Sequence, residues 1–144
     1  MNQPIPQSTM DLVELRIPCR AEWVALARLA VAAVANRLRL SVEEIEDVKL
    51  AVAEACTAVI QHENHGETIE LTCETSPELL RIRVRDGGRH LHQPAAQRSM
   101  DLDEARVAGL GVFLIRTLMD EVSYDAHPEM GTDLVMVKRL TGSR

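Results

Sequence analysis

The sequence predicts an α+β fold in which helices cover one face of a sheet. Two helical patterns, over residues 21–38 and 42–63, fill the first half of the chain, and alternating patterns typical of antiparallel strands dominate the second half. Elements segregated in this way pack as a layer of helices on a sheet. A chain of 144 residues is also long enough to bury its own core. We therefore expect a two-layer α/β sandwich with a mixed or antiparallel sheet.

Composition narrows the possible functions. The net charge of -6 and the scarcity of clustered Lys and Arg argue against binding to nucleic acid or to an anionic membrane. No apolar run reaches the roughly 18 residues of a membrane span, and the N-terminus lacks the pattern of a signal peptide, so we expect a cytoplasmic protein. Cys19, Cys56 and Cys73 form no C-x-x-C pair, which favours reduced thiols over disulfides or a zinc site.

The chain begins with a polar segment that contains two prolines, and we expect residues 1–9 to be a flexible terminus before a single domain at 10–140. Residues 11–17 alternate between apolar and polar side chains, which predicts a half-buried strand ending at Pro18. The edge of such a strand could pair with a second copy of the chain, since an edge strand presents unpaired backbone groups.

The helix predicted over residues 21–38 carries an apolar stripe that includes Trp23 and Leu26. Arg28 falls outside this stripe. Its position alone indicates a solvated surface cation as readily as a functional one.

The most regular pattern is the helix predicted over residues 42–63. Ser41 and Glu44 have the S-x-x-E spacing of a capping box, which predicts where this helix starts. Glu54 is unusual in this helix, because it lies in the most apolar part, where burying an unpaired carboxylate costs free energy. Either Glu54 lies on the solvent edge of the helix or it has a function.

The second half of the chain reads as strands over 67–74, 79–85, 122–127 and 133–138, with a helix over 112–119. Residues 86–108 show no sustained period. A loop of this length usually has a function, and we interpret it as a lid. Within it, His90 and His92 lack a third ligand, so no metal site is predicted there.

Several motifs occur together and in one order. They are EIEDVKLAVAEACT at 44–57, Asp86-Gly87-Gly88 after a strand, Gly109-Leu110-Gly111 before a helix, and PEMGT at 128–132. With them, the chain resembles the anti-sigma factor serine-protein kinases of the RsbW and SpoIIAB type, members of the GHKL ATPase superfamily. The resemblance runs from about residue 10 to about residue 140. It implies the Bergerat ATP-binding sandwich, with ATP or ADP between the helices and the lid.

The resemblance also implies roles around the adenine ring. Asp86 would accept a hydrogen bond from the exocyclic amine of adenine, and Gly88 would let the backbone approach the ring. The hydroxyl of Thr132 would lie beside that aspartate. Taken alone, the D-x-G triplet is weak evidence, because it also marks ordinary turns.

Other residues would act on the phosphates. Gly109, Leu110 and Gly111 would supply free amides at a helix start, although such glycines also mark ordinary helix starts. Arg106 would contact the terminal phosphate, and Glu54 would act as the base that polarises the attacking hydroxyl.

The resemblance further implies the partners. In this family, an arginine at the position of Arg28 docks both a sigma factor of RNA polymerase and a STAS-domain anti-anti-sigma factor. The implied setting is transcription regulation by partner switching, as in stress response and sporulation, and the implied assembly is a homodimer.

The sequence departs from the family at Ala58, where the family has an asparagine that binds Mg²⁺. Alanine cannot ligate a metal, which puts Mg²⁺ and the kinase rate in doubt. Gln61, one turn further on, is a possible substitute. Two functions stay open, an active kinase and a pseudokinase that only binds its partners. A detached histidine-kinase catalytic domain is disfavoured, because no phosphoacceptor helix is visible.

Overall fold

The computed structural model describes residues 10–87, 111–127 and 131–140. Five strands form one sheet in the order β1-β2-β3-β5-β4, and every neighbouring pair is antiparallel. The strands are β1 (Asp11–Pro18), β2 (Thr68–Thr75), β3 (Leu79–Asp86), β4 (Glu121–His127) and β5 (Gly131–Arg139). The observed bounds differ from the predicted ones by at most two residues.

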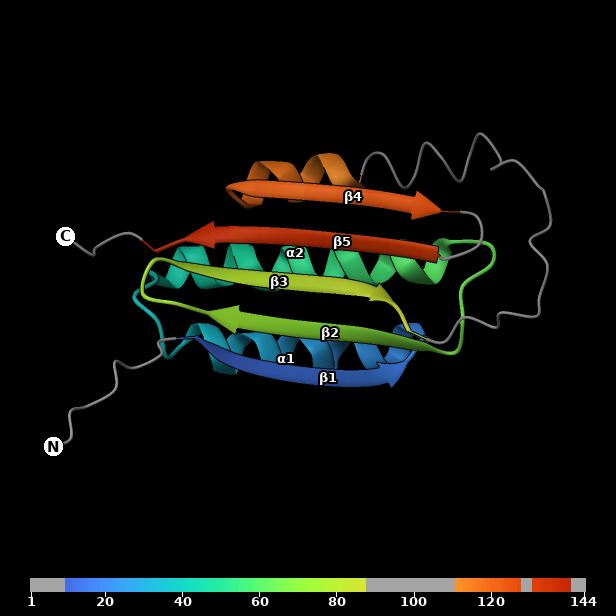
Figure 1. The fold of residues 1–144 in the computed structure, drawn as a ribbon, viewed down its shortest axis with the longest axis horizontal. Coiled ribbons are helices and arrows are strands. Elements are labelled where there is room, and N and C mark those ends of the chain that lie inside the picture. Colours follow the sequence, from blue (N-terminus) through green and yellow to red (C-terminus); the bar gives the residue numbers. More distant parts are fainter. Residues whose placement is uncertain (1–9, 88–110, 128–130, 141–144) are drawn as a thin grey trace, which may run out of the picture.

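The helices lie together on one side of the sheet, as Figure 1 shows. They are η1 (Ala21–Trp23), α1 (Val24–Ala35), α2 (Val42–Gln61) and a helix over residues 111–118. This arrangement confirms the predicted α+β sandwich with its helices on one face.

The core lies between the helices and the sheet. Alternate residues of β2 and β3 are buried, as a strand with one covered face requires. From the helix side, α2 contributes the largest set of buried residues, which are Val48, Ala51, Val52, Ala55, Cys56, Ala58 and Val59. α2 lies in the middle of the helix layer. Its residues therefore determine which side chains extend from the helices toward the candidate functional site described below.

The capping box at the start of α2 forms as predicted. The Glu44 amide donates to the Ser41 hydroxyl at 3.0 Å, and the Ser41 amide donates to the Glu44 carboxylate at 2.8 Å. These bonds satisfy two backbone donors that a helix start leaves without intrahelical partners.

The prediction for the first helix was wrong in part. It begins as the 3-10 turn η1, α1 ends at Ala35, and both Trp23 (38 % exposed) and Leu26 (40 % exposed) lie outside the core. The buried residues of α1 are spaced four apart, at Ala27, Val31 and Ala35. Small side chains at this spacing let α1 pack closely on α2 along one narrow stripe, which leaves the larger apolar side chains outside.

The opposite face of the sheet is polar. Arg83 of β3 donates to both carboxylate oxygens of Asp133 on β5, at 2.9 and 2.6 Å. Arg81 and Arg85 of the same strand pair with glutamates of β2. Exposed pairs like these add little stability, about 0 to 1 kcal/mol each. In the part of the chain that the structure describes, no helix is long and apolar enough to cross a membrane.

Candidate functional site

Three elements meet at one end of the sheet. Figure 1 shows the C-terminal end of α2, the end of β3 and the start of β5 close to one another there. Asp86 is the last residue of β3 and is only 7 % exposed. Its Oδ2 accepts a hydrogen bond of 2.7 Å from the amide of Gly66, in the turn after α2. A buried carboxylate is therefore fixed at the end of the sheet.

Gly131 brings the start of β5 against this carboxylate. Its φ of +81° lies in the region that side chains rarely adopt, and a Cβ on it would lie 2.7 Å from both the Cβ and Oδ2 of Asp86. Only glycine fits here. Sequence reasoning did not place Gly131 or Gly66 in the site, although the glycine of PEMGT, next to Thr132, was a signal for the first.

Thr132 is the other buried polar residue at this end. It is 1 % exposed, and its Oγ1 has no hydrogen-bond partner among the residues that the structure describes. Thr132, Asp86 and Gly131 line a cavity of about 380 Å³ at this end of the sheet. Residues of the polar sheet face, which are Glu70, Arg85 and Asp133, line it as well. A buried hydroxyl without a partner is costly, so a ligand that bonds to it recovers that free energy.

Glu54 lies beside Gly111, the first residue that the structure describes in the helix over residues 111–118. A Cβ on Gly111 would lie 3.4 Å from the Oε1 atom of Glu54. Glu54 is neither buried nor fully exposed, so it lies at the margin of the core rather than within it. The structure thus brings the carboxylate of Glu54 close to the backbone at Gly111.

Comparison with known proteins decides the family. Residues 17–138 match the model of the histidine kinase-like ATPase domain. A serine-protein kinase RsbW of Halalkalibacterium halodurans is 36% identical over 138 residues, which cover 90% of this chain and 84% of the relative. The chain belongs to the RsbW family of serine-protein kinases, within the histidine kinase-like ATPases.

Two further RsbW relatives agree. The serine-protein kinase RsbW of Bacillus subtilis is 32% identical over 148 residues, covering 96% of this chain and 91% of the relative. That of Listeria monocytogenes is 36% identical over 138 residues, covering 89% and 87%. These matches confirm the resemblance found from the motifs, and an ATPase domain of this family implies ATP binding.

Ala58 follows Glu54 by one helical turn on α2. It is 7 % exposed and belongs to the hydrophobic core, and its methyl group offers no ligand atom. No group of three or more His, Cys, Asp or Glu that could hold a metal occurs within residues 10–87, 111–127 and 131–140. Ala58 itself therefore supplies no ligand to a Mg²⁺ ion.

The remaining predicted site residues fall in two groups. Gly88, Arg106, Gly109 and Leu110 lie outside the described residues, as do His90, His92 and most of the proposed lid. Arg28 lies exposed on α1, and it does not line the cavity at Asp86.

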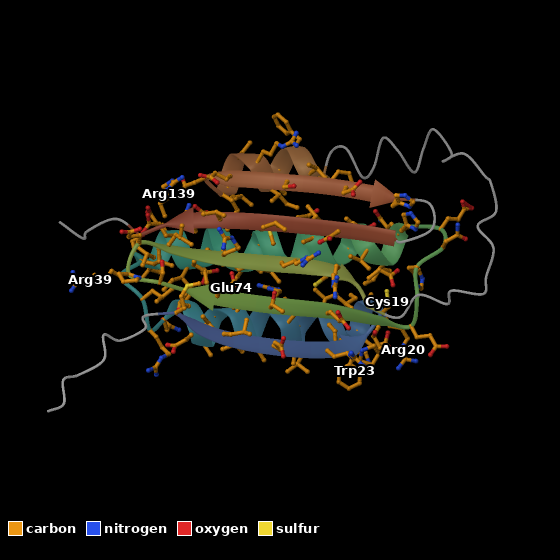
Figure 2. The ribbon with its side chains drawn as sticks, viewed as in Figure 1. Cys19, Arg20, Trp23, Arg39, Glu74 and Arg139 are labelled. Atoms are coloured by element: carbon orange, nitrogen blue, oxygen red, sulfur yellow. The ribbon has the colours of Figure 1, made fainter. Side chains whose placement is uncertain are left out.

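A cysteine that sequence reasoning assigned no role lies near Asp86. Figure 2 shows Cys19 at the end of the sheet where β3 ends. Burial, and secondly the charge of Asp86, raise the pKa of the Cys19 thiol to about 11. Burial, and secondly Cys19, raise the pKa of Cys56 to about 12. All three cysteines are free and buried.

Proposed function

We propose that the chain is an anti-sigma factor that binds a sigma factor of RNA polymerase and uses ATP to phosphorylate a serine of a STAS-domain anti-anti-sigma factor. One observation carries the proposal. A buried carboxylate and a buried hydroxyl, of Asp86 and Thr132, and the carboxylate of Glu54 beside Gly111 occur in a chain that belongs to the RsbW family. These are the groups that adenine and a phosphoryl acceptor require.

In this proposal each residue has a separate task. Asp86 accepts from the adenine amine and Thr132 bonds to the ring, which selects adenine. The backbone amides at Gly111 hold phosphate oxygens. Glu54 orients the serine hydroxyl and accepts its proton as the new oxygen–phosphorus bond forms and the bond between the β and γ phosphates breaks, releasing ADP.

A second candidate is a pseudokinase that binds sigma factor and antagonist without phosphorylating either. Ala58 favours it, because its methyl group supplies no oxygen ligand for Mg²⁺ on the triphosphate. In both cases ATP or ADP is held at the same place, so nucleotide binding alone does not separate the two.

We also propose that the chain is cytoplasmic, because both partners act inside the cell, and that it forms a homodimer. β1 is an edge strand of the sheet, and Leu12 and Val13 on it are exposed. An apolar strand edge of this kind favours pairing with a second copy. Sedimentation of the purified chain tests the dimer.

The proposed function is tested with purified chain, γ-labelled ATP and the STAS-domain protein encoded nearest to it. An active kinase transfers label to the STAS-domain protein, and a variant of that protein with alanine at the acceptor serine receives none. A pseudokinase binds the STAS-domain protein in a pull-down but transfers no label. Absence of both binding and transfer, for this partner and for the sigma factors of the same cell, would contradict the proposal.

Arg28 is expected to dock both partners. The change Arg28→Ala should weaken binding to the sigma factor and to the antagonist about tenfold, since loss of an interface charge removes one contact and slows encounter. The fold should persist, because Arg28 is exposed. Surface plasmon resonance measures both affinities, with Arg37→Ala, an exposed arginine just beyond the end of α1, as the matched control. Equal affinities for Arg28→Ala and wild type would show that the assigned role is wrong.

A further inference from the structure

Glu70 is a carboxylate that the proposed function does not use. It lies in β2, on the polar face of the sheet, and both of its oxygens are paired. Oε2 accepts a hydrogen bond of 2.9 Å from Arg16 of β1, and Oε1 accepts one of 3.1 Å from Arg85 of β3. Exposed pairs of this kind add little stability, but charged donors on both neighbouring strands fix the direction in which the Glu70 side chain extends.

Gly87, the residue after Asp86, lies directly against this side chain. A Cβ on Gly87 would be 2.4 Å from Cγ and 2.8 Å from Cδ of Glu70, closer than real Cβ atoms approach other atoms. Among the glycines that the structure describes, only Gly131 has a positive φ. The glycine at 87 is therefore required by the space beside Glu70 and not by its backbone conformation. Because two arginines hold the carboxylate, the Glu70 side chain cannot turn away without losing its pairs.

The chain is held against β2 on both sides of Asp86. Before it, Arg85 lies opposite Glu70 in the register of β2 and β3. After it, the amide of Gly87 donates to the carbonyl of Thr68 at 2.9 Å. Side chains alternate along a strand, so Asp86 points to the face of the sheet opposite Glu70. The position of the Asp86 carboxylate on that face depends on how closely the backbone around it lies against β2.

We propose that Glu70 is a positioning residue for Asp86 and that it acts through Gly87. The Glu70 side chain sets how closely the chain after β3 lies against β2, and Gly87 allows that approach. Asp86 is thereby held where its carboxylate accepts a hydrogen bond from the adenine amine. The inference deepens the proposed function and rests on it, since it assumes that Asp86 contacts adenine.

Glu70 also lines the cavity at Asp86, so a direct contact with the nucleotide has to be separated from positioning. The two roles predict different results for a pair of changes. In a direct contact, loss of the Glu70 side chain weakens binding whichever residue stands at 87. In the positioning role, Gly87→Ala harms binding only while the Glu70 side chain is present, because the new methyl group takes the space that Glu70→Ala vacates. A double-mutant cycle measures this dependence.

The test uses competition titrations against a fluorescent adenine nucleotide with two competitors, which are ATP and purine riboside triphosphate, the analogue of ATP without the 6-amino group. We expect Gly87→Ala to weaken ATP binding about tenfold and Glu70→Ala to weaken it about threefold. The double variant should bind ATP within about threefold of wild type, where independent effects would give about thirtyfold. Purine riboside triphosphate should bind every variant within about twofold of wild type, because it has no amine for Asp86 to accept from.

Glu74 provides the matched control. It is a glutamate of the same strand and the same face, it pairs with Arg81 at 3.2 Å, and it does not line the cavity at Asp86. Figure 2 shows Glu74 away from the end of the sheet where Cys19 lies. Glu74→Ala should leave ATP affinity within about twofold of wild type, and it should not restore ATP binding to Gly87→Ala.

The outcomes separate the inference from the proposed function. If wild type does not bind ATP, the proposed function fails, and the inference fails with it. If wild type binds ATP, three results overturn the positioning role alone: Gly87→Ala binds ATP as wild type does, the double variant is as weak as Gly87→Ala, or the variants lose both competitors equally. Should Gly87→Ala not fold, the double variant should still fold and bind ATP, and its failure to do either would overturn the inference.

Discussion

Replacing Asp86 by asparagine is expected to weaken ATP and ADP binding by about 1 to 3 kcal/mol, on the order of tenfold to a hundredfold. The carboxylate accepts from the Gly66 amide through Oδ2, and a carboxylate has acceptor positions for the adenine amine as well. An amide of the same shape brings a donor, so one of these two partners would face another donor. Isothermal titration with ATP and ADP measures the loss.

The control for this change is Asp11→Asn, at the start of β1. Asp11 is exposed and does not line the cavity at Asp86, so the same chemical change there should leave nucleotide affinity within about twofold. Circular dichroism melting checks that both variants fold. Nucleotide affinity unchanged in Asp86→Asn would remove Asp86 from the site.

Replacing Ala58 by asparagine is expected to raise Mg²⁺-dependent ATP affinity, on the order of tenfold, and to raise phosphoryl transfer to the antagonist serine. The amide would lie one helical turn from Glu54 on the same face of α2, where it offers the missing oxygen ligand. The change costs about 0.7 kcal/mol in helix propensity, and more because Ala58 is in the core, so some loss of thermal stability should accompany it.

Ala53→Asn is the matched control, because it places the same amide on the same helix but about 100° around from Glu54. It should change neither the Mg²⁺ dependence nor the transfer rate. Fast Mg²⁺-dependent phosphorylation by the unmodified chain would support the kinase and contradict the role given to Ala58. It would mean that another residue, such as the exposed Gln61 at the end of α2, supplies the oxygen.

The features that the sequence predicted well are local or carried by motifs. The start of α2 followed from Ser41 and Glu44, which bond to each other across a single turn. The strands followed from alternation, because each buries one face. Asp86 and Thr132 were paired through family motifs, and the structure places both on one cavity.

The features that the sequence did not reveal depend on contacts between distant segments. The contact of Gly131 with Asp86 joins residues on two strands, and its tightness depends on a positive φ that a motif does not state. Likewise, the exposure of Trp23 and Leu26 depends on how α1 rotates against α2. Glu70 has an ordinary place in a strand pattern, and only the fold brings it against Gly87.

The measurement that tests the central claim most directly is calorimetric titration of the unmodified chain with ATP, with and without Mg²⁺. We expect saturable binding of one ATP per chain, with an affinity that Mg²⁺ changes by less than about threefold, because Ala58 supplies no ligand to the metal. Absence of ATP binding, or an affinity that rises steeply with Mg²⁺, would contradict it.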